Sequence, residues 1–84
     1  MSQQATTSIS SFYPAAFVYA KGGELIGIHK SADDKRAQFL FADPQRCDEL
    51  LKVFNFSKED APEALIDARK MVQAIKMLKE KLYQ

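Results

Sequence analysis

Apolar residues recur at helical spacing in three stretches of this chain, and two short stretches between the first and second of these alternate apolar with polar residues. Spacing of three and four predicts helices with one buried face, and alternation predicts strands. The first helix is predicted over residues 12–20. Its apolar face is formed by Phe12, Ala16, Phe17 and Ala20. Gly22-Gly23 is expected to end this helix, because glycine tolerates the positive φ common at that position.

Two strands are predicted to follow, over residues 24–31 and 36–42, with a polar turn between them that contains Asp33 and Asp34. Strands this close in the chain predict an antiparallel β-hairpin. One face of the hairpin is predicted to pack against the helices. It consists of Ile26, Ile28, Ala37, Phe39 and Phe41. The second face is predicted to carry Leu25, Gly27, His29, Gln38 and Leu40.

Two further helices are predicted after the hairpin. Asp43 suits the N-cap of the second helix and Pro44 its first position, where a missing N–H costs nothing. Its apolar stripe is Cys47, Leu50, Leu51 and Phe54. Pro62 fits the first turn of the last helix, which has the most regular apolar pattern in the chain. That pattern is formed by Leu65, Ala68, Val72, Ile75, Leu78 and Leu82.

Residues 1–11 are rich in serine, threonine and glutamine, and Ile9 is the only strongly apolar residue among them after the initial methionine. We therefore expect a flexible N-terminal arm over residues 1–11 and one folded domain over residues 12–84. The predicted element order is α-β-β-α-α. A lone hairpin is marginal in water, so the helices must cover one of its faces. The sequence predicts a small α+β fold.

The composition indicates the cellular compartment to expect. The chain has 84 residues, 46% of them hydrophobic, and a formal net charge of +1. Cys47 is the only cysteine, so no disulfide forms within the chain, which is typical of a reducing compartment. No apolar run approaches the roughly 20 residues that span a membrane. The start of the chain lacks the basic and apolar regions of a signal peptide. We expect a cytoplasmic protein with no membrane contact.

The residues with catalytic potential do not form a recognisable site. His29 and Cys47 lack the third or fourth partner that zinc requires. Asp33 and Asp34 are explained by turn formation, since Asp side chains bond their own backbone there. Gly22-Gly23 has neither spacing of the glycine-rich phosphate loops. The sequence therefore predicts a protein that is not an enzyme, with no metal, no cofactor and no small-molecule substrate.

The open edges of the predicted hairpin indicate binding to a protein, because an unpaired strand edge can accept another strand. Edge pairing between two copies would give a homodimer that buries Leu25 and Leu40. The candidate interaction surface is the second face and tip of the hairpin. It consists of Leu25, His29, Lys30, Lys35, Arg36, Gln38 and Leu40. A protein partner or a second copy is the preferred hypothesis, since the net charge is so small.

Nucleic acid is the alternative partner. His29, Lys30, Lys35 and Arg36 flank the predicted hairpin tip, where basic side chains would meet phosphates. The last helix adds further cations. They are Arg69, Lys70, Lys76, Lys79 and Lys81. Acidic residues are interspersed with these cations, as on an ordinary solvated surface of mixed charge, and the small net charge favours the protein partner.

Several short motifs run in a characteristic order along the chain. They are Ala15-Ala16-Phe17, Gly22-Gly23, Leu25-Ile26-Gly27-Ile28, Phe39-Leu40-Phe41 followed by Asp43, and Ala74-Ile75 through Leu78-Lys79 to Leu82-Tyr83. This pattern resembles a family of small uncharacterised domains of bacteria, phages and other mobile elements. The resemblance covers residues 12–84 and departs from the family over residues 58–71, where the link into the last helix is longer. It implies an accessory protein of phage or mobile-element origin, with no catalytic or ligand-binding residues to transfer.

Overall fold

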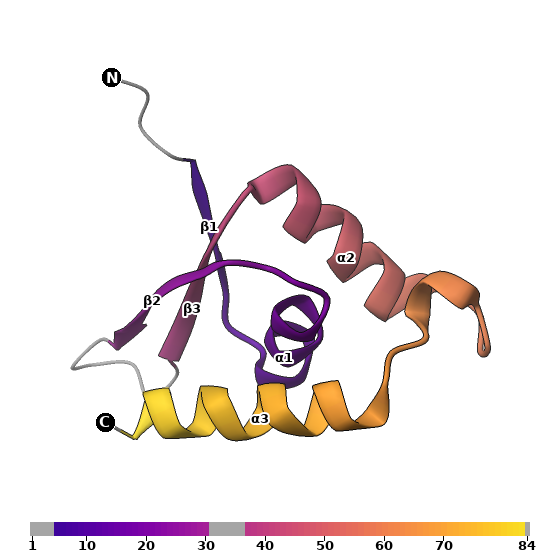
Figure 1. Ribbon diagram of the computed structural model, residues 1–84. Helices are drawn as coiled ribbons and strands as arrows, with labels where there is room; N and C mark the ends of the chain where they lie inside the picture. The colour runs from indigo at the N-terminus through magenta and orange to yellow at the C-terminus, as the bar shows by residue number, and fades with distance from the viewer. Residues whose placement is uncertain (1–4, 31–36, 84) are drawn as a thin grey trace.

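The computed structural model describes residues 5–30 and 37–83 (Figure 1). Within these residues the chain forms strands β1, β2 and β3, α-helices α1, α2 and α3, and a 3₁₀ turn, η1. Their bounds are β1 Thr6–Ile9, α1 Phe12–Ala20, β2 Leu25–Lys30, β3 Ala37–Ala42, α2 Pro44–Phe56, η1 Pro62–Ala64 and α3 Ala68–Leu82. The predicted α+β class is confirmed.

The sheet has the order β1-β3-β2 within the described residues, and both pairings are antiparallel. The β2–β3 pairing confirms the predicted hairpin. The flexible arm expected over residues 1–11 is wrong for Thr6–Ile9, which form β1 and extend the sheet to a third strand. Ile9 lies opposite Phe39 and Thr7 opposite Phe41, so β1 adds a buried aliphatic side chain to the core face. The central strand is β3, and β2 remains an edge.

A bulge in β2 changes which of its side chains reach the core. Leu25 pairs with Phe41 and Gly27 with Leu40, which leaves Ile26 as the extra residue between them. Because partners across a sheet share a face, Leu25 lies with Phe41 on the core side. Ile26 is 46% exposed. The faces predicted for Leu25 and Ile26 are therefore wrong. The face predicted for Ile28 is right, because Ile28 packs against the core.

The glycines after α1 end the helix as predicted, each for its own reason. Gly22 has a φ of +98°, which suits glycine alone among the common residues. Its N–H donates to the Tyr19 carbonyl and the Gly23 N–H to the Val18 carbonyl, at 3.1 and 2.9 Å. This is the Schellman pattern of hydrogen bonds. At Gly23 a β-carbon would lie 2.7 Å from Val18 Cγ1 and 2.8 Å from its carbonyl oxygen.

We expect Gly23→Ala to lower the free energy of unfolding by about 1–3 kcal/mol, because the new methyl group meets a buried side chain and fixed backbone. Gly27→Ala is the matched control. Nothing lies within 4 Å of a β-carbon at Gly27, so that change should be neutral or slightly stabilising. Urea unfolding followed by circular dichroism measures both. Equal midpoints for the two variants would show that the contact with Val18 does not constrain the turn.

Helix α2 begins where the sequence predicts. Asp43 has a φ of +59° and its carboxylate accepts a hydrogen bond from the Arg46 N–H at 3.2 Å. Pro44 occupies the first position. Cys47 and Leu50 are buried, as expected of the apolar stripe. Phe54 is partly exposed and its ring lies 5.3 Å from that of Phe17, so it ties the end of α2 to α1.

Helix α3 starts later than predicted. Pro62 begins the separate turn η1, and α3 begins at Ala68, whose preceding residue Asp67 accepts a hydrogen bond from the Arg69 N–H. Leu65 therefore lies outside the helix and is exposed. The side chains of α3 that meet the core are Met71, Ala74, Ile75 and Leu78. Val72 is 49% exposed, so the buried stripe is rotated away from the predicted one.

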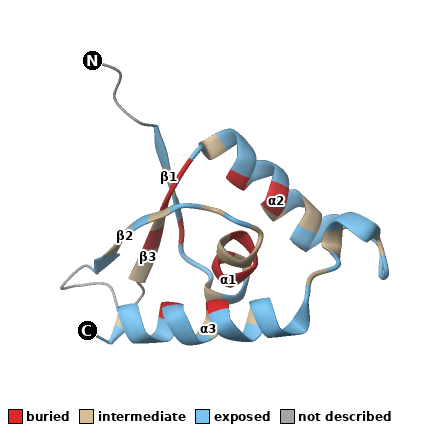
Figure 2. Ribbon diagram, viewed as in Figure 1, coloured by how far each residue is buried: buried red, intermediate tan, exposed pale blue. Residues whose placement is uncertain are grey.

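Helix α1 lies at the centre of the molecule, between the sheet, α2 and α3 (Figures 1 and 2). Four consecutive residues of α1 are buried. They are Ala15, Ala16, Phe17 and Val18. The small side chains of Ala15, Ala16 and Val18 let neighbouring elements approach closely, and the helix is buried on more than one face. Phe39 and Phe41 of β3 and Leu78 of α3 complete the core around it.

Candidate functional site

The structure keeps His29, Gln38 and Leu40 of the predicted surface on one face of the sheet and places Leu25 on the other. Leu25 is wrong as a surface residue, because it packs against the core. His29 and Gln38 are cross-strand partners on the opposite face of the sheet from Phe39, and His29 is exposed. Lys35 and Arg36 lie outside the described residues, as do Asp33 and Asp34.

Two other members of the predicted surface have structural surroundings that the sequence does not indicate. The Lys30 ammonium donates to the Leu82 carbonyl and so joins the end of β2 to the end of α3. Leu40 is half-buried on the central strand, with Ser8 and Gly27 as its neighbours across the sheet. A dimer formed along the β2 edge would therefore not bury Leu25 and Leu40 in the way predicted.

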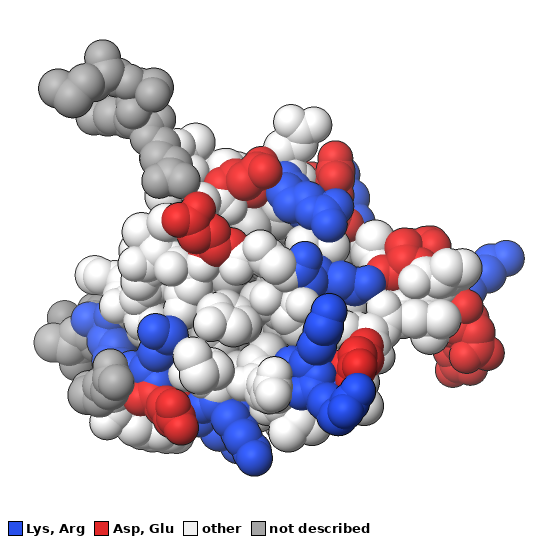
Figure 3. Space-filling model, viewed as in Figure 1, with Lys and Arg blue, Asp and Glu red and all other residues white. Residues whose placement is uncertain are grey.

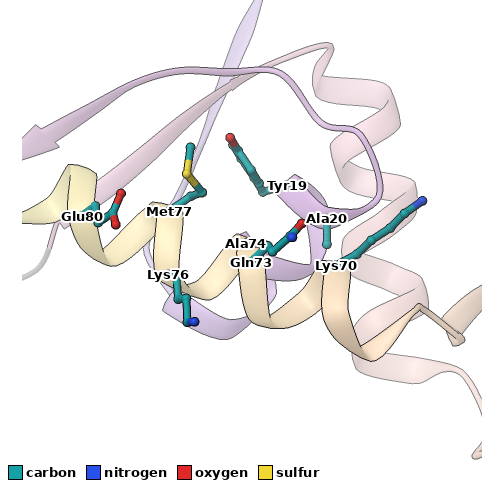
Figure 4. Close-up of a pocket in the computed structure, with 8 residues that line it drawn as sticks. All are labelled: Tyr19, Ala20, Lys70, Gln73, Ala74, Lys76, Met77 and Glu80. Atoms are coloured by element: carbon teal, nitrogen blue, oxygen red, sulfur yellow. The ribbon is translucent and has the colours of Figure 1, made fainter.

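A groove lies between α1 and α3. It has a volume of about 550 Å³. We call it the α1–α3 groove. Its lining residues are Tyr19 and Ala20 of α1 and Lys70, Gln73, Ala74, Lys76, Met77 and Glu80 of α3. Figure 4 shows Tyr19 and Met77 on the same side of α3, with Glu80 towards one end and Lys70 towards the other, while Lys76 points away.

Strand β2 runs from a point close to the end of α1 in the sequence to the last turn of α3. It starts at Leu25, shortly after the end of α1 at Ala20, and ends at Lys30, which bonds the last turn of α3. Its outer side has no neighbouring strand within the described part of the chain. An uncharged area occupies the middle of this face of the molecule (Figure 3). The strand is thus tied to α3 at its end, although no residue of β2 lines the groove.

Charge is separated along the molecule, although the net charge is small. Helix α3 carries five cations and one acidic residue, Glu80. Residues 43–64, which include α2 and η1, carry six acidic residues and three cations. The residues of α3 lie along the lower part of Figure 3, and acidic atoms gather on the loop that projects at the right. This separation makes α3 a positive surface and the region after α2 a negative one.

Sequence reasoning missed Tyr19 and Met77 as site residues. Tyr19 lies on the flank of the predicted first helix, and Met77 lies beside the predicted stripe of the last one. Both are amphipathic side chains at the edge of the buried face of a helix. That pattern does not show which two helix edges meet in the fold. They are 58 positions apart in the chain, and only the packing of α1 on α3 brings them together.

Cys47 is buried, as predicted for a small apolar residue. Its Sγ donates to the Ala42 carbonyl at 3.4 Å. Burial raises the pKa of the thiol, and the nearby Asp43 carboxylate raises that pKa further. Within residues 5–30 and 37–83 no three His, Cys, Asp or Glu side chains gather in a way that could hold a metal ion.

Because the thiolate is the reactive form, we expect Cys47 to resist alkylation in the folded protein. Iodoacetamide labelling followed by mass spectrometry should show little modification in buffer at pH 8 over a period that labels the urea-unfolded chain completely. The unfolded chain is the control. If the folded protein and the unfolded chain were labelled at the same rate, the N-terminus of α2 would have to open readily in the folded protein.

The model of a family described as a domain of unknown function (DUF5659) matches residues 4–84. No curated protein and no solved structure matches. The predicted resemblance to a family of small uncharacterised domains is confirmed, and the family model includes β1 as well as the predicted domain. None of the helices that the structure describes has the length and apolar character needed to cross a membrane.

Proposed function

Since the chain belongs to this domain family (DUF5659), whose function is unknown, we propose a function from its own geometry: a non-enzymatic protein-binding domain. The α1–α3 groove together with the β2 edge receives an extended segment of a partner protein. The observation that carries this proposal is the free edge of β2 beside an apolar groove. An accessory role, a cytoplasmic setting and a phage or mobile-element origin remain part of the same proposal.

The β2 edge supports binding through the backbone. An edge strand presents N–H and C=O groups along its outer side, and an extended peptide can add to them as a further strand. In such complexes the backbone bonds supply affinity, while alternate side chains enter the neighbouring groove and supply specificity. The bulge at Ile26 limits the regular edge to the part of β2 that follows it.

The groove supports binding of an apolar side chain. Met77 is 40% exposed and Tyr19 is half-buried, so both offer apolar surface that a ligand can cover. Methionine adapts its shape to irregular partners, and tyrosine is enriched at the centres of interfaces. Ala20 and Ala74 also line the groove, and their small side chains leave space for a ligand. The preferred partner segment is extended, with an aliphatic or aromatic residue and acidic neighbours that suit the cations of α3.

Selection from a random-peptide display library tests this proposal. We expect immobilised wild-type protein to enrich peptides with an apolar anchor and acidic flanks. Met77→Lys should weaken binding of the enriched peptides by about tenfold or more, since it places a charge in the groove. Val72→Lys is the matched control, because Val72 is also an exposed apolar residue of α3 but does not line the groove. Enriched peptides that bind both variants alike would place the site elsewhere.

Nucleic acid is a second candidate partner because of the five cations of α3. If α3 meets phosphates, Lys79→Glu combined with Lys81→Glu should strongly weaken binding to a labelled 20-nucleotide DNA or RNA. Each lost phosphate contact should reduce the slope of log affinity against log salt by about one. Fluorescence anisotropy at low and moderate salt measures this. No binding of either polymer at low salt would end this alternative.

A further inference from the structure

Phe56 is an aromatic residue with no place in the core. It ends α2 and is 82% exposed. The preceding aromatic of the helix, Phe54, contacts Phe17, so the exposure of Phe56 does not come from a loosely attached helix end. An aromatic side chain this exposed is available to a partner, and aromatic residues are enriched at protein interfaces. The chain after it projects from the body of the molecule (Figure 1).

The projecting segment is acidic. Residues 56–65, which we call the acidic protrusion, carry Glu59, Asp60 and Glu63 against one cation, Lys58. All four side chains are exposed. The far end of the segment is held in place, because the Lys21 ammonium donates to the Leu65 carbonyl at 2.7 Å. The protrusion therefore presents an aromatic anchor and a group of carboxylates on a supported base.

The α1–α3 groove has the opposite properties. It offers apolar surface at Tyr19 and Met77, and Lys70 stands at one end of it. Helix α3 as a whole carries five cations and one acidic residue, whereas the acidic protrusion carries three acidic residues and one cation. Opposite charge on two surfaces steers their encounter and fixes their relative orientation. The chain thus contains both halves of a complementary pair.

We infer that the acidic protrusion of a second copy of this chain occupies the α1–α3 groove. Phe56 of one copy covers Tyr19 and Met77 of the next, and the carboxylates that follow it face the cations of α3. The inference rests on the proposed function, because it names the partner of the same groove. Since the two surfaces are different, the contact is head-to-tail and leaves a free groove at one end and a free protrusion at the other.

Sedimentation velocity tests this inference. With dissociation constants in the micromolar to millimolar range typical of weak surfaces, we expect the sedimentation coefficient of the wild type to rise between about 10 µM and 1 mM. The rise should be smaller at high salt, because the charges that assist the contact are exposed. Phe56→Ala should weaken association by about tenfold or more. Tyr83→Ala is the matched control, since Tyr83 is also 82% exposed.

Mixing two variants distinguishes this contact from a symmetric dimer. Phe56→Ala retains an intact groove, and Met77→Lys retains an intact protrusion. Each alone should remain monomeric, and an equimolar mixture should form a one-to-one complex through the single remaining contact. Pairing of two β2 edges would not respond in this way. The inference is overturned by a wild type that stays monomeric at 1 mM, by a Phe56→Ala variant that associates like the wild type, or by a mixture that forms no complex.

The outcomes also separate this inference from the proposed function. A monomeric wild type whose groove still binds selected peptides, in a manner sensitive to Met77→Lys, would overturn self-association alone. If the selected peptides bind Met77→Lys as tightly as the wild type, the groove is not a binding site for any partner. Circular dichroism of each variant confirms folding, and both replaced side chains are exposed enough to be changed without opening the core.

Discussion

Phe41→Ala is expected to leave much of the protein unfolded under mild conditions. Phe41 is fully buried on the central strand, with Thr7 and Leu25 as its partners on the two neighbouring strands. Truncating a buried phenylalanine removes about 3–5 kcal/mol of stability. At about 0.05–0.15 kcal/mol per residue, an 84-residue domain has about 4–13 kcal/mol in total. The change therefore removes a large part of the stability that holds the sheet to α1.

Urea unfolding followed by circular dichroism measures this loss. Phe56→Ala is the matched control, because it removes the same ring from an exposed position. Its midpoint should stay close to that of the wild type, whereas that of Phe41→Ala should fall steeply or lie below the accessible range. Similar midpoints for the two variants would contradict the placement of β3 at the centre of the core.

Ile9→Ala should lower the free energy of unfolding by about 2–4 kcal/mol, since it leaves a cavity beside Phe39. Ile9 is buried, and its strand provides one edge of the sheet. If residues 1–11 were a flexible arm, Ile9→Ala would not change the free energy of unfolding. This variant therefore distinguishes strand β1 from the arm that the sequence predicts. Ser8→Ala is the control, because Ser8 is exposed on the same strand.

Thermal unfolding followed by circular dichroism measures both variants. A loss of about 1 kcal/mol corresponds to roughly 4–8 °C in Tm for a domain of this size, so the expected shift for Ile9→Ala is well outside experimental scatter. Equal Tm values for Ile9→Ala, Ser8→Ala and the wild type would show that β1 contributes nothing to the folded state.

Local signals account for the elements that the sequence predicts correctly. Each of these signals acts on the backbone next to it, so its consequence can be derived without the rest of the fold. The signals are Gly22-Gly23, the Asp43-Pro44 pair and the alternation around Phe39. β1 lacks such a signal. Its sequence, Thr6 to Ile9, contains one large apolar residue, and its strand conformation depends on pairing with β3. Pairing across more than thirty residues is a tertiary effect that local pattern does not reveal.

The two other errors also have tertiary causes. In β2 the bulge moves Leu25 onto the core face opposite Phe41, and the side-chain period of two then fails. In the C-terminal region, Asp60 adopts a φ of +64° and η1 forms before the helix, so that Asp67 becomes the N-cap. Aspartate suits both an N-cap and an exposed position inside a helix, so residue type alone does not decide where this helix begins.

The candidate site is less predictable than the fold. Its apolar surface comes from Tyr19 and Met77, which are neighbours only because α1 packs on α3. Its electrostatic character is concealed by a net charge of +1, since the positive charge of α3 and the negative charge of residues 43–64 nearly cancel in the sum. The free edge of β2 was predictable from the hairpin, whereas the groove beside it was not.

Nitrogen-15 chemical-shift mapping with a peptide selected by the wild-type protein tests the central claim most directly, which is that the groove beside the β2 edge binds a protein segment. We expect the backbone amide signals of β2 and of Gln73 and Met77 to move during the titration, while those of α2 stay in place. Shifts confined to α2, or to the outward-facing side of α3 around Val72, would contradict the claim.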